Sequence, residues 1–425
     1  MIRITQVRLD NFLSFQGPVV IENIAPISAF VGPNNSGKSN LIRVLEFYHK
    51  LSIKSKVAEY PSTDNIKGLQ HRLAPNDPLF IEIKYRHENK NRSNDSLEIT
   101  HSVSFNEKGE YSRERLWFKR LNDKVDRIHE IEIFKVEKNG DEYMTYLQNL
   151  ESVNAFLSTS HSAKTPSLER SNLRSNKPFG WDWAKLDNPG MKIYGKLINA
   201  IQRWKFILAN RARNSSEQFL YNQLGRERVE TNALIDLIGN LTVTHDINFE
   251  QENGKTYALV GDLSSKKARF RLDQLGSGYE QIFLLLPEIY QGYLDDTLFF
   301  IDEPEVHLHP HFQRRLLQYL IQRSTNNQFL MATHSTIFCR QQDGLLQPYL
   351  VKKENDRTQI EIIGKQKMED IKSILGHVNT DLFGYNAALF VEGYAEENAL
   401  PLLAKNLGFD MVDYGIRILN SEGYG

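Results

Sequence analysis

The chain has 425 residues, which is too long for one compact core and predicts about two or three domains. Its 52 lysines and arginines nearly balance 53 aspartates and glutamates, which excludes a globally basic nucleic-acid binder and leaves only a local patch for such contacts. The one cysteine, Cys339, excludes an internal disulfide framework and a cysteine-rich metal site, and favours a reducing compartment such as the cytoplasm.

Residues 2–31 are expected to form strands. Apolar and polar residues alternate from Ile2 to Leu9, a pattern unlike a basic export signal with its apolar block. A turn at 16–18 precedes an extended run at 19–21, and residues 27–31 form a third, apolar run. No later apolar run reaches membrane-spanning length, so we expect a soluble cytoplasmic protein with no membrane partner.

A glycine-containing loop follows the run at 27–31 and opens a helical pattern. It comprises Gly32, Pro33, Asn34, Asn35, Ser36, Gly37, Lys38 and Ser39, with Asn40 directly after it. In this strand–loop–helix setting, backbone N–H groups can hold phosphates, Lys38 can reach the β and γ oxygens, and Ser39 can ligate Mg²⁺. We therefore expect ATP or GTP to bind here; the alternative is a glycine-rich turn that happens to carry Lys-Ser.

Helical spacing from Ser39 to Tyr48 and alternation at 78–87 predict α/β architecture. Residues 88–200 are polar, carry hairpin signals near 106–109 and 139–140, and are interpreted as an insertion. Within it, 158–180 is expected to be a mobile loop, and a solvated linker is favoured over a nucleic-acid contact.

A strand at 205–208 and a helical stretch at about 216–241 follow the insertion. Two basic groups come later in the chain and could face a nucleic-acid backbone, although an ordinary solvated strand edge explains either group as well. They are Lys266, Lys267, Arg269 and Arg271, and Lys352 with Lys353.

The apolar run 298–301 ends in Asp302 and Glu303, as in a buried parallel strand that delivers acids to a site. Asp302 would hold the Mg²⁺ shell, and Glu303 would orient and deprotonate the attacking water. A strand that ends in solvated acids is the alternative.

Two more segments fit a nucleotide site. Ser277 and Gly278 precede an apolar helical run at 282–289, so a second helix N-terminus could meet a γ-phosphate. The apolar run 328–333 ends at His334, which would sense the γ-phosphate, although a histidine at a strand end is usually structural. The combination is more specific than any of its parts.

Together these motifs resemble an ABC-type ATPase head of the SMC/RecF-like branch. The block Ile301-Asp-Glu-Pro-Glu-Val-His-Leu-His-Pro310 is similar to the overcoming-lysogenization-defect (OLD) family, and the resemblance covers residues 1–50 and 200–425. It implies a composite site in a dimer, in which Lys38 and Ser39 of one protomer face Ser277 and Gly278 of the other across ATP.

The same resemblance implies that Glu305 to Pro310 cross the dimer interface. Gln70 is the candidate for the glutamine that senses Mg²⁺ in such heads.

A second chemistry is indicated near the end of the sequence. The apolar run 387–391 is followed by Glu392 and Gly393, and Glu396 lies one turn into the expected helix, so both carboxylates could share a divalent cation. The segment resembles the opening of a Toprim domain, which implies that Glu392 acts at a Mg²⁺ or Mn²⁺ site that cleaves or rejoins nucleic acid, with Glu396 as the extra acid of the OLD branch. A helix capped by acids is the alternative.

The expected fold is therefore α/β, with an ATPase head and a truncated Toprim domain. The head has an N-terminal lobe at 1–87, the insertion at 88–200 and a C-terminal lobe at 201–384 that includes dimerisation helices at 214–245; the Toprim part is 385–425. The Asp-x-Asp pair of a Toprim site does not occur by Gly425, so a truncated nuclease that cleaves poorly alone is expected.

Two functions stay open. One is an ATP-controlled DNA endonuclease of the OLD type in anti-phage defence, with Mg²⁺ as cofactor and Mn²⁺ as an option at the Toprim site. The other is an ATP-driven clamp or sensor that holds nucleic acid or a defence partner, such as a retron DNA–RNA, and does not cut. A homodimer or higher homo-oligomer is expected in both cases.

Overall fold

The computed structural model describes most of the two main sheets and the helices between them. The described residues are 2–53, 68–71, 77–87, 96–108, 110–121, 130–139, 142–148, 153, 169–170, 189–208, 244–252, 255–262, 269–271, 274, 285, 289, 296–339, 344–364, 387–391, 394–408, 411 and 416–420.

The first sheet is antiparallel and has eight strands in the order β2-β1-β4-β5-β6-β7-β8-β9. The strands are β1 (Ile2–Asp10), β2 (Val19–Ile21), β4 (Leu79–His87), β5 (Leu97–Phe105), β6 (Tyr111–Arg120), β7 (Glu130–Asn139), β8 (Glu142–Leu147) and β9 (Glu169–Arg170). In β4, Leu79, Ile81, Ile83 and Tyr85 are buried and alternate with more exposed residues, most of them charged, as expected when one face of a sheet is solvated.

Residues 88–200 were expected to be an insertion, and in the part of this range that the structure describes, strands β5 to β9 continue the sheet that begins with β1. β5 pairs with β4 over nine positions, from Leu79 opposite Phe105 to His87 opposite Leu97, and β6 to β9 extend the same sheet. The two expected hairpins are present, between β5 and β6 and between β7 and β8. The polar character of this region reflects the solvated face of a long sheet that begins with β1.

The second sheet is mostly parallel and has six strands in the order β10-β14-β15-β3-β16-β17. They are β3 (Ile27–Val31), β10 (Lys205–Leu208), β14 (Leu298–Asp302), β15 (Gln328–Thr333), β16 (Leu346–Glu354) and β17 (Arg357–Ile362), of which only β17 runs antiparallel to its neighbour. The strands expected at 27–31, 205–208, 298–302 and 328–333 are therefore confirmed.

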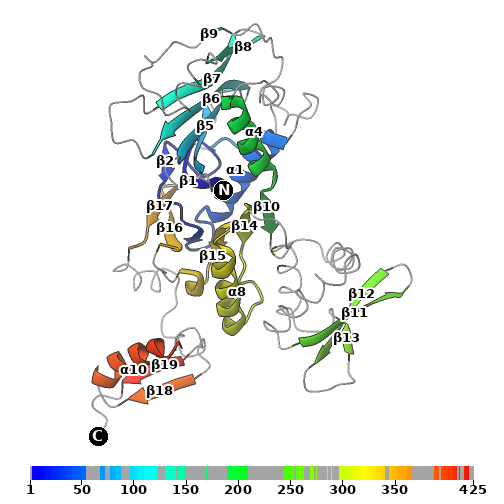
Figure 1. The fold of residues 1–425 in the computed structure, drawn as a ribbon, viewed down its shortest axis with the longest axis vertical. Coiled ribbons are helices and arrows are strands. Elements are labelled where there is room, and N and C mark those ends of the chain that lie inside the picture. Colours follow the sequence, from blue (N-terminus) through cyan, green and yellow to red (C-terminus); the bar gives the residue numbers. More distant parts are fainter. Residues whose placement is uncertain are drawn as a thin grey trace.

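Helix α1 (Lys38–Ile53) lies between the two sheets (Figure 1). Its buried residues, among them Leu45 and Tyr48, share one core with both sheets. Along β14 the faces alternate, because Leu298 and Phe300 join this core whereas Phe299 and Ile301 join a second one on the opposite face. A parallel sheet buried on both faces needs this continuous apolar run.

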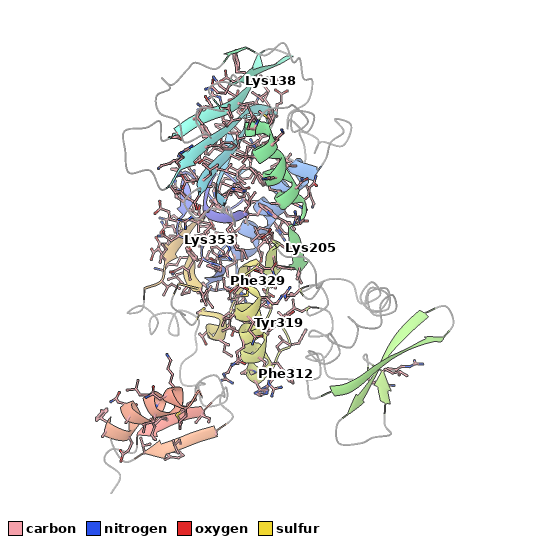
Figure 2. The ribbon with its side chains drawn as sticks, in the orientation of Figure 1. Lys138, Lys205, Phe312, Tyr319, Phe329 and Lys353 are labelled. Carbon is pink, nitrogen blue, oxygen red and sulfur yellow. The ribbon has the colours of Figure 1, made fainter. Side chains whose placement is uncertain are left out.

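The second core is closed by α8 (Pro310–Arg323) and the short 3₁₀ helix η4 (Thr336–Cys339). Phe329 of β15 and Tyr319 of α8 both belong to it, and Figure 2 shows their side chains in the packed region between sheet and helix. Helix α4 (Pro189–Gln202) packs against the first core through Tyr194, Leu197 and Ile201. The order of layers is thus antiparallel sheet, α1, parallel sheet and α8.

Two smaller units complete the described structure. One is an antiparallel sheet of β11 (Thr244–Glu252), β12 (Lys255–Asp262) and β13 (Arg269–Arg271). The other pairs β18 (Ala387–Val391) in parallel with β19 (Ile416–Asn420) and includes α10 (Tyr394–Asn406). Within this second unit, Phe390 and Leu407 are 71% and 85% exposed.

Several expected elements lie outside the described residues: the loop at 158–180 apart from β9, the helical stretch at 216–241 with the dimerisation helices at 214–245, and most of the helix at 282–289. None of the helices in the described part of the chain combines the length and the apolar character that a bilayer crossing requires.

A polar cluster is buried inside the first core. The Glu114 carboxylate accepts hydrogen bonds from Tyr111 at 2.7 Å and Tyr194 at 3.2 Å, and it faces His101 Nε2 at 2.8 Å. The other ring nitrogen of His101 lies 2.5 Å from the hydroxyl of Tyr48 on α1. Because the side chains of His101 and Glu114 have no exposed surface, their polar atoms cannot hydrogen-bond to water and depend on these partners.

Replacing Glu114 by Ala is expected to lower the free energy of unfolding by about 3–5 kcal/mol, since buried donors lose their common acceptor. Glu132→Ala is the matched control, because Glu132 lies on the same sheet and pairs with Arg115 at the solvated face. It should cost less than about 1 kcal/mol. Urea unfolding measures both values, and equal losses would contradict the assigned importance of the cluster.

Candidate functional site

The carboxyl ends of three neighbouring parallel strands meet at one edge of the second sheet. Val31 of β3 pairs with Thr333 of β15, and Asp302 of β14 pairs with Ala332 of β15. The glycine loop, the acidic pair and His334 each begin where one of these strands ends. Ligands of open parallel sheets bind at such an edge, so the topology brings together segments that are about 270 to 300 residues apart in sequence.

Lys38 is the first residue of α1, and its side chain folds back onto the start of the glycine loop. Its ammonium donates hydrogen bonds to the carbonyl oxygens of Gly32 and Pro33, both at 2.9 Å, and the residue is only 5% exposed. Burial lowers the pKa of Lys38 to about 8, while the nearby carboxylates of Glu303, Glu305 and Asp302 act in the opposite direction.

The glycine loop packs closely against neighbouring backbone and side chains. Gly37 has φ of +109°, and a Cβ there would lie 2.2 Å from the hydroxyl of Thr358. That hydroxyl donates to the Ser36 carbonyl at 2.9 Å, and a Cβ on Gly32 would meet the Val351 carbonyl at 2.1 Å. Glycine is needed at both positions, because the loop packs too closely on Val351 and Thr358 to leave room for a side chain.

Ser39 joins the glycine loop to the acidic strand end. Its hydroxyl donates a 3.1 Å hydrogen bond to Oδ1 of Asp302. Burial raises the pKa of the Asp302 carboxyl, and the Ser39 bond works against that shift. A hydroxyl and a partly desolvated carboxylate side by side are oxygen donors of the kind that Mg²⁺ prefers.

Glu303 and His334 face each other beside this pair. His334 Nε2 lies 3.8 Å from Glu303 Oε1, and both side chains keep about a third of their surface exposed. Burial lowers the pKa of His334 and the Lys38 charge adds to this, so the ring is largely neutral at neutral pH. Glu303 has φ of +51°, a left-handed conformation that is unusual for a side chain of this size and that concentrates at functional sites.

Glu305 is a site residue whose contacts the sequence did not indicate. The sequence predicted only that it begins a loop that crosses a dimer interface, yet its carboxylate accepts from the Thr333 hydroxyl at 2.7 Å and from the His334 backbone N–H. Burial raises the pKa of its carboxyl. The available signal was its place two residues after Glu303 in the acidic segment.

Other predicted residues are not brought to this edge by the described structure. Ser277, Gly278 and Glu392 lie outside the described residues. Glu396 is exposed in the first turn of α10. The Gln70 side chain is buried and donates to the Glu107 carbonyl at 3.1 Å, a packing contact that gives no support to a Mg²⁺-sensing role.

The basic groups give mixed results. Lys266 and Lys267 lie outside the described residues, whereas Arg269 and Arg271 belong to β13. Lys352 and Lys353 are on β16 and pair with Glu361 at 3.6 Å and Asp356 at 3.0 Å, as in an ordinary solvated strand edge.

Within the described residues, no group of three or more histidine, cysteine, aspartate or glutamate side chains is gathered closely enough to hold a metal ion unaided. The Ser39 and Asp302 oxygens nevertheless fit a Mg²⁺ ion that takes its other ligands from water and phosphate, which is how Mg²⁺ is usually bound in nucleotide sites. The glycine loop fits the phosphates, because the buried Lys38 ammonium lies against the carbonyl oxygens of Gly32 and Pro33 and supplies the positive charge that phosphate needs.

Residues 27–340 match the family model described as "AAA domain, putative AbiEii toxin, Type IV TA system". The match covers well over half of the chain, and the chain therefore belongs to this AAA domain family and contains an ATPase-type domain. The matched range includes the glycine loop, the acidic pair and His334.

Three solved structures are similar to this chain at low identity. An SMC head domain from Thermotoga maritima gives 15% identity and a TM-score of 0.43, covering 85% of this chain and 99% of its own. An SMC head bound to the C-winged helix domain of ScpA gives 12% identity and a TM-score of 0.46, covering 86% of this chain and 99% of its own. An SMC head with an extended coiled coil, bound to the C-terminal domain of ScpA derived from Pyrococcus furiosus, gives 12% and 0.48, with 88% and 99% coverage. A search of curated proteins found no significant match.

Nucleotide affinity is expected to depend on the protonation of Lys38. Its pKa is about 8 without ligand, and a bound triphosphate favours the ammonium form and would raise that pKa. Affinity should therefore be constant near neutral pH and fall above about pH 8, by up to ~10-fold per pH unit, until the pKa of the bound state is reached. Titration with a fluorescent ATP analogue from pH 7 to 9.5 measures this.

Lys38→Arg is the control for that titration, because its guanidinium stays charged over the whole range. Whatever affinity this variant retains should not decline with pH. A flat profile for the wild-type protein would show that the proton on Lys38 does not contribute to binding.

Proposed function

We propose that this chain binds and hydrolyses ATP at the edge formed by β3, β14 and β15, and that two copies close around the nucleotide. The observation that supports this most is the hydrogen bond between Ser39 and Asp302, beside a Glu303–His334 pair separated by 3.8 Å. It joins the phosphate-binding loop to the acidic strand end in one constellation, as phosphoryl transfer requires.

Each residue would have a distinct role in hydrolysis. Ser39 and Asp302 would hold Mg²⁺, which neutralises phosphate charge when it is bound. Lys38 would stabilise the β and γ oxygens, and Glu303 would orient the attacking water and take its proton. His334, largely neutral, would donate a hydrogen bond towards the γ-phosphate.

Closure of two copies would complete the site. Ser277 and Gly278 of a second copy would supply a hydroxyl and a backbone N–H from a helix N-terminus. This arrangement is part of the proposal because it rests on the resemblance of the sequence motifs to ABC-type heads.

We further propose that nucleotide state controls a metal-dependent nuclease of the OLD type that acts on DNA, with a role in anti-phage defence. The support is a parallel β18–α10–β19 unit, with Glu392 directly after the first strand and Glu396 in the first helical turn. Carboxylates in that arrangement can share Mg²⁺ or Mn²⁺.

A second candidate is an ATP-driven clamp or sensor that acts on a partner and does not cut DNA. The family description names a toxin of a toxin–antitoxin system, which fits an ATPase that switches an effector. A defence protein or a retron DNA–RNA would be a partner of this kind.

The ATPase proposal is tested by two variants, of which one should keep ATP binding and the other should lose it. Glu303→Gln should keep ATP affinity within about threefold and lower kcat by about 10²-fold or more, because the water loses its base. Lys38→Ala should abolish ATP binding. Phosphate release, nucleotide titration and size-exclusion chromatography provide the measurements.

In those measurements Glu303→Gln with ATP should elute as a long-lived dimer and Lys38→Ala should not. Unchanged turnover in Glu303→Gln would rule out its role as base, and retained ATP affinity in Lys38→Ala would rule out the site.

The nuclease proposal is tested with the full-length protein on supercoiled DNA in Mg²⁺ or Mn²⁺. Glu392→Ala should abolish nicking and leave ATP hydrolysis unchanged, because the two sites use different residues. Lys405→Ala, at the other end of α10, is the control and should nick normally. Absence of nicking by the wild-type protein in both metals and all nucleotide states would favour the sensor.

A further inference from the structure

A ring of hydrogen bonds connects the acidic segment, the loop after β15 and the start of α8. The Thr333 hydroxyl donates to Oε2 of Glu305 at 2.7 Å and accepts from the Ser335 backbone N–H at 3.0 Å. The Ser335 hydroxyl donates to Oε1 of Gln313 at 2.6 Å, and Gln313 Nε2 donates to the Leu308 carbonyl at 2.7 Å. The Leu308 N–H returns to the Glu305 carbonyl at 2.9 Å, which closes the ring.

Glu305 is the member of this ring that reaches His334 directly. Its second carboxylate oxygen accepts the backbone N–H of His334, so the two oxygens hold consecutive residues of the strand end. Thr333 has no exposed surface and cannot exchange this partner for water. Because Glu305 holds the Thr333 side chain and the N–H of the 333–334 peptide, it restricts the backbone from which the His334 ring projects.

Glu303 is also hydrogen-bonded to the end of β15, through its backbone. Its backbone N–H donates to the Ala332 carbonyl at 2.8 Å, and its carboxylate lies 3.8 Å from His334 Nε2. The separation between Glu303 and His334 therefore depends on how the acidic segment is attached to residues 332–334. Glu305 supplies the side-chain part of that attachment.

We propose that Glu305 is the positioning residue for His334. Its carboxylate accepts hydrogen bonds from the Thr333 hydroxyl and the His334 backbone N–H, and these bonds keep the histidine ring at the distance from Glu303 that hydrolysis requires. The inference rests on the proposed ATP hydrolysis. It assigns Glu305 no contact with nucleotide or water, so Glu305 acts only through His334.

A carboxylate at this position is otherwise unfavourable. Glu305 is half-buried and Glu303 lies nearby, so desolvation and a like charge both oppose ionisation. Hydrogen bonds from the His334 backbone N–H, the Thr333 hydroxyl and the backbone N–H of Glu305 itself offset this, and the first two come from the strand end that carries His334. A purely structural residue could fill the same space without a charge.

A double-mutant cycle in ATP hydrolysis tests the proposal. Glu305→Ala should lower kcat by about 10²-fold and change KM by less than about threefold, because displacement of a catalytic group by about 1 Å has an effect of this size. In a His334→Ala background the same change should lower kcat by less than about threefold, since the group that Glu305 positions is already absent.

Thr333 offers a second route that leaves the Glu305 side chain intact. Thr333→Val keeps the shape and removes the hydroxyl, whereas Thr333→Ser keeps the hydroxyl, so only the valine variant should lose kcat. Glu354→Ala, at the exposed end of β16, is the control for removal of a carboxylate and should have wild-type kcat.

The outcomes separate the inference from the function on which it rests. Equal losses from Glu305→Ala in both backgrounds, or equal kcat values for the valine and serine variants, would overturn the positioning role while Glu303→Gln still confirmed hydrolysis. If Glu305→Ala did not fold, the comparison of Thr333→Val with Thr333→Ser would test the positioning role by itself. Loss of ATP binding in Glu305→Ala would also overturn the proposal, because that residue would then support the phosphate loop.

Discussion

The structure depends on the position of α1 between two sheets. One face of this helix packs on the antiparallel sheet and the other on the parallel sheet, and its first turn carries Lys38 and Ser39. The Ser39–Asp302 hydrogen bond then connects that turn to β14. Because packing sets the helix from both sides, the phosphate loop has little freedom to move independently of the acids that it must meet.

Local periodicity explains which elements the sequence could predict. β1, β4, β14 and β15 were predicted because apolar alternation or an unbroken apolar run is a property of adjacent residues. Residues 88–200 were interpreted as an insertion because they are polar, and polarity alone does not distinguish an inserted segment from the solvated face of a sheet. Pairing of β4 with β5 shows that this region continues the first sheet, and amino-acid composition does not indicate which strands pair.

The candidate site shows the same division. Lys38, Asp302, Glu303 and His334 were found because each sits at a strand end with a recognisable residue order, and the structure brings them to one edge. Glu305 was missed as a partner of Thr333, because that contact joins residues 28 positions apart. The buried pair His101 and Glu114 was missed for a similar reason: in sequence they are two polar residues of unremarkable strands.

The left-handed backbone of Glu303 has an evolutionary consequence. A non-glycine residue there stores strain of about 1 kcal/mol or more, which glycine or asparagine would relieve. Selection for heat resistance alone would therefore favour replacing the side chain that we propose to activate water. Under the proposed mechanism, variants with glycine or asparagine at position 303 should be more stable and should lose ATP hydrolysis, so stability and turnover place opposite demands on this position.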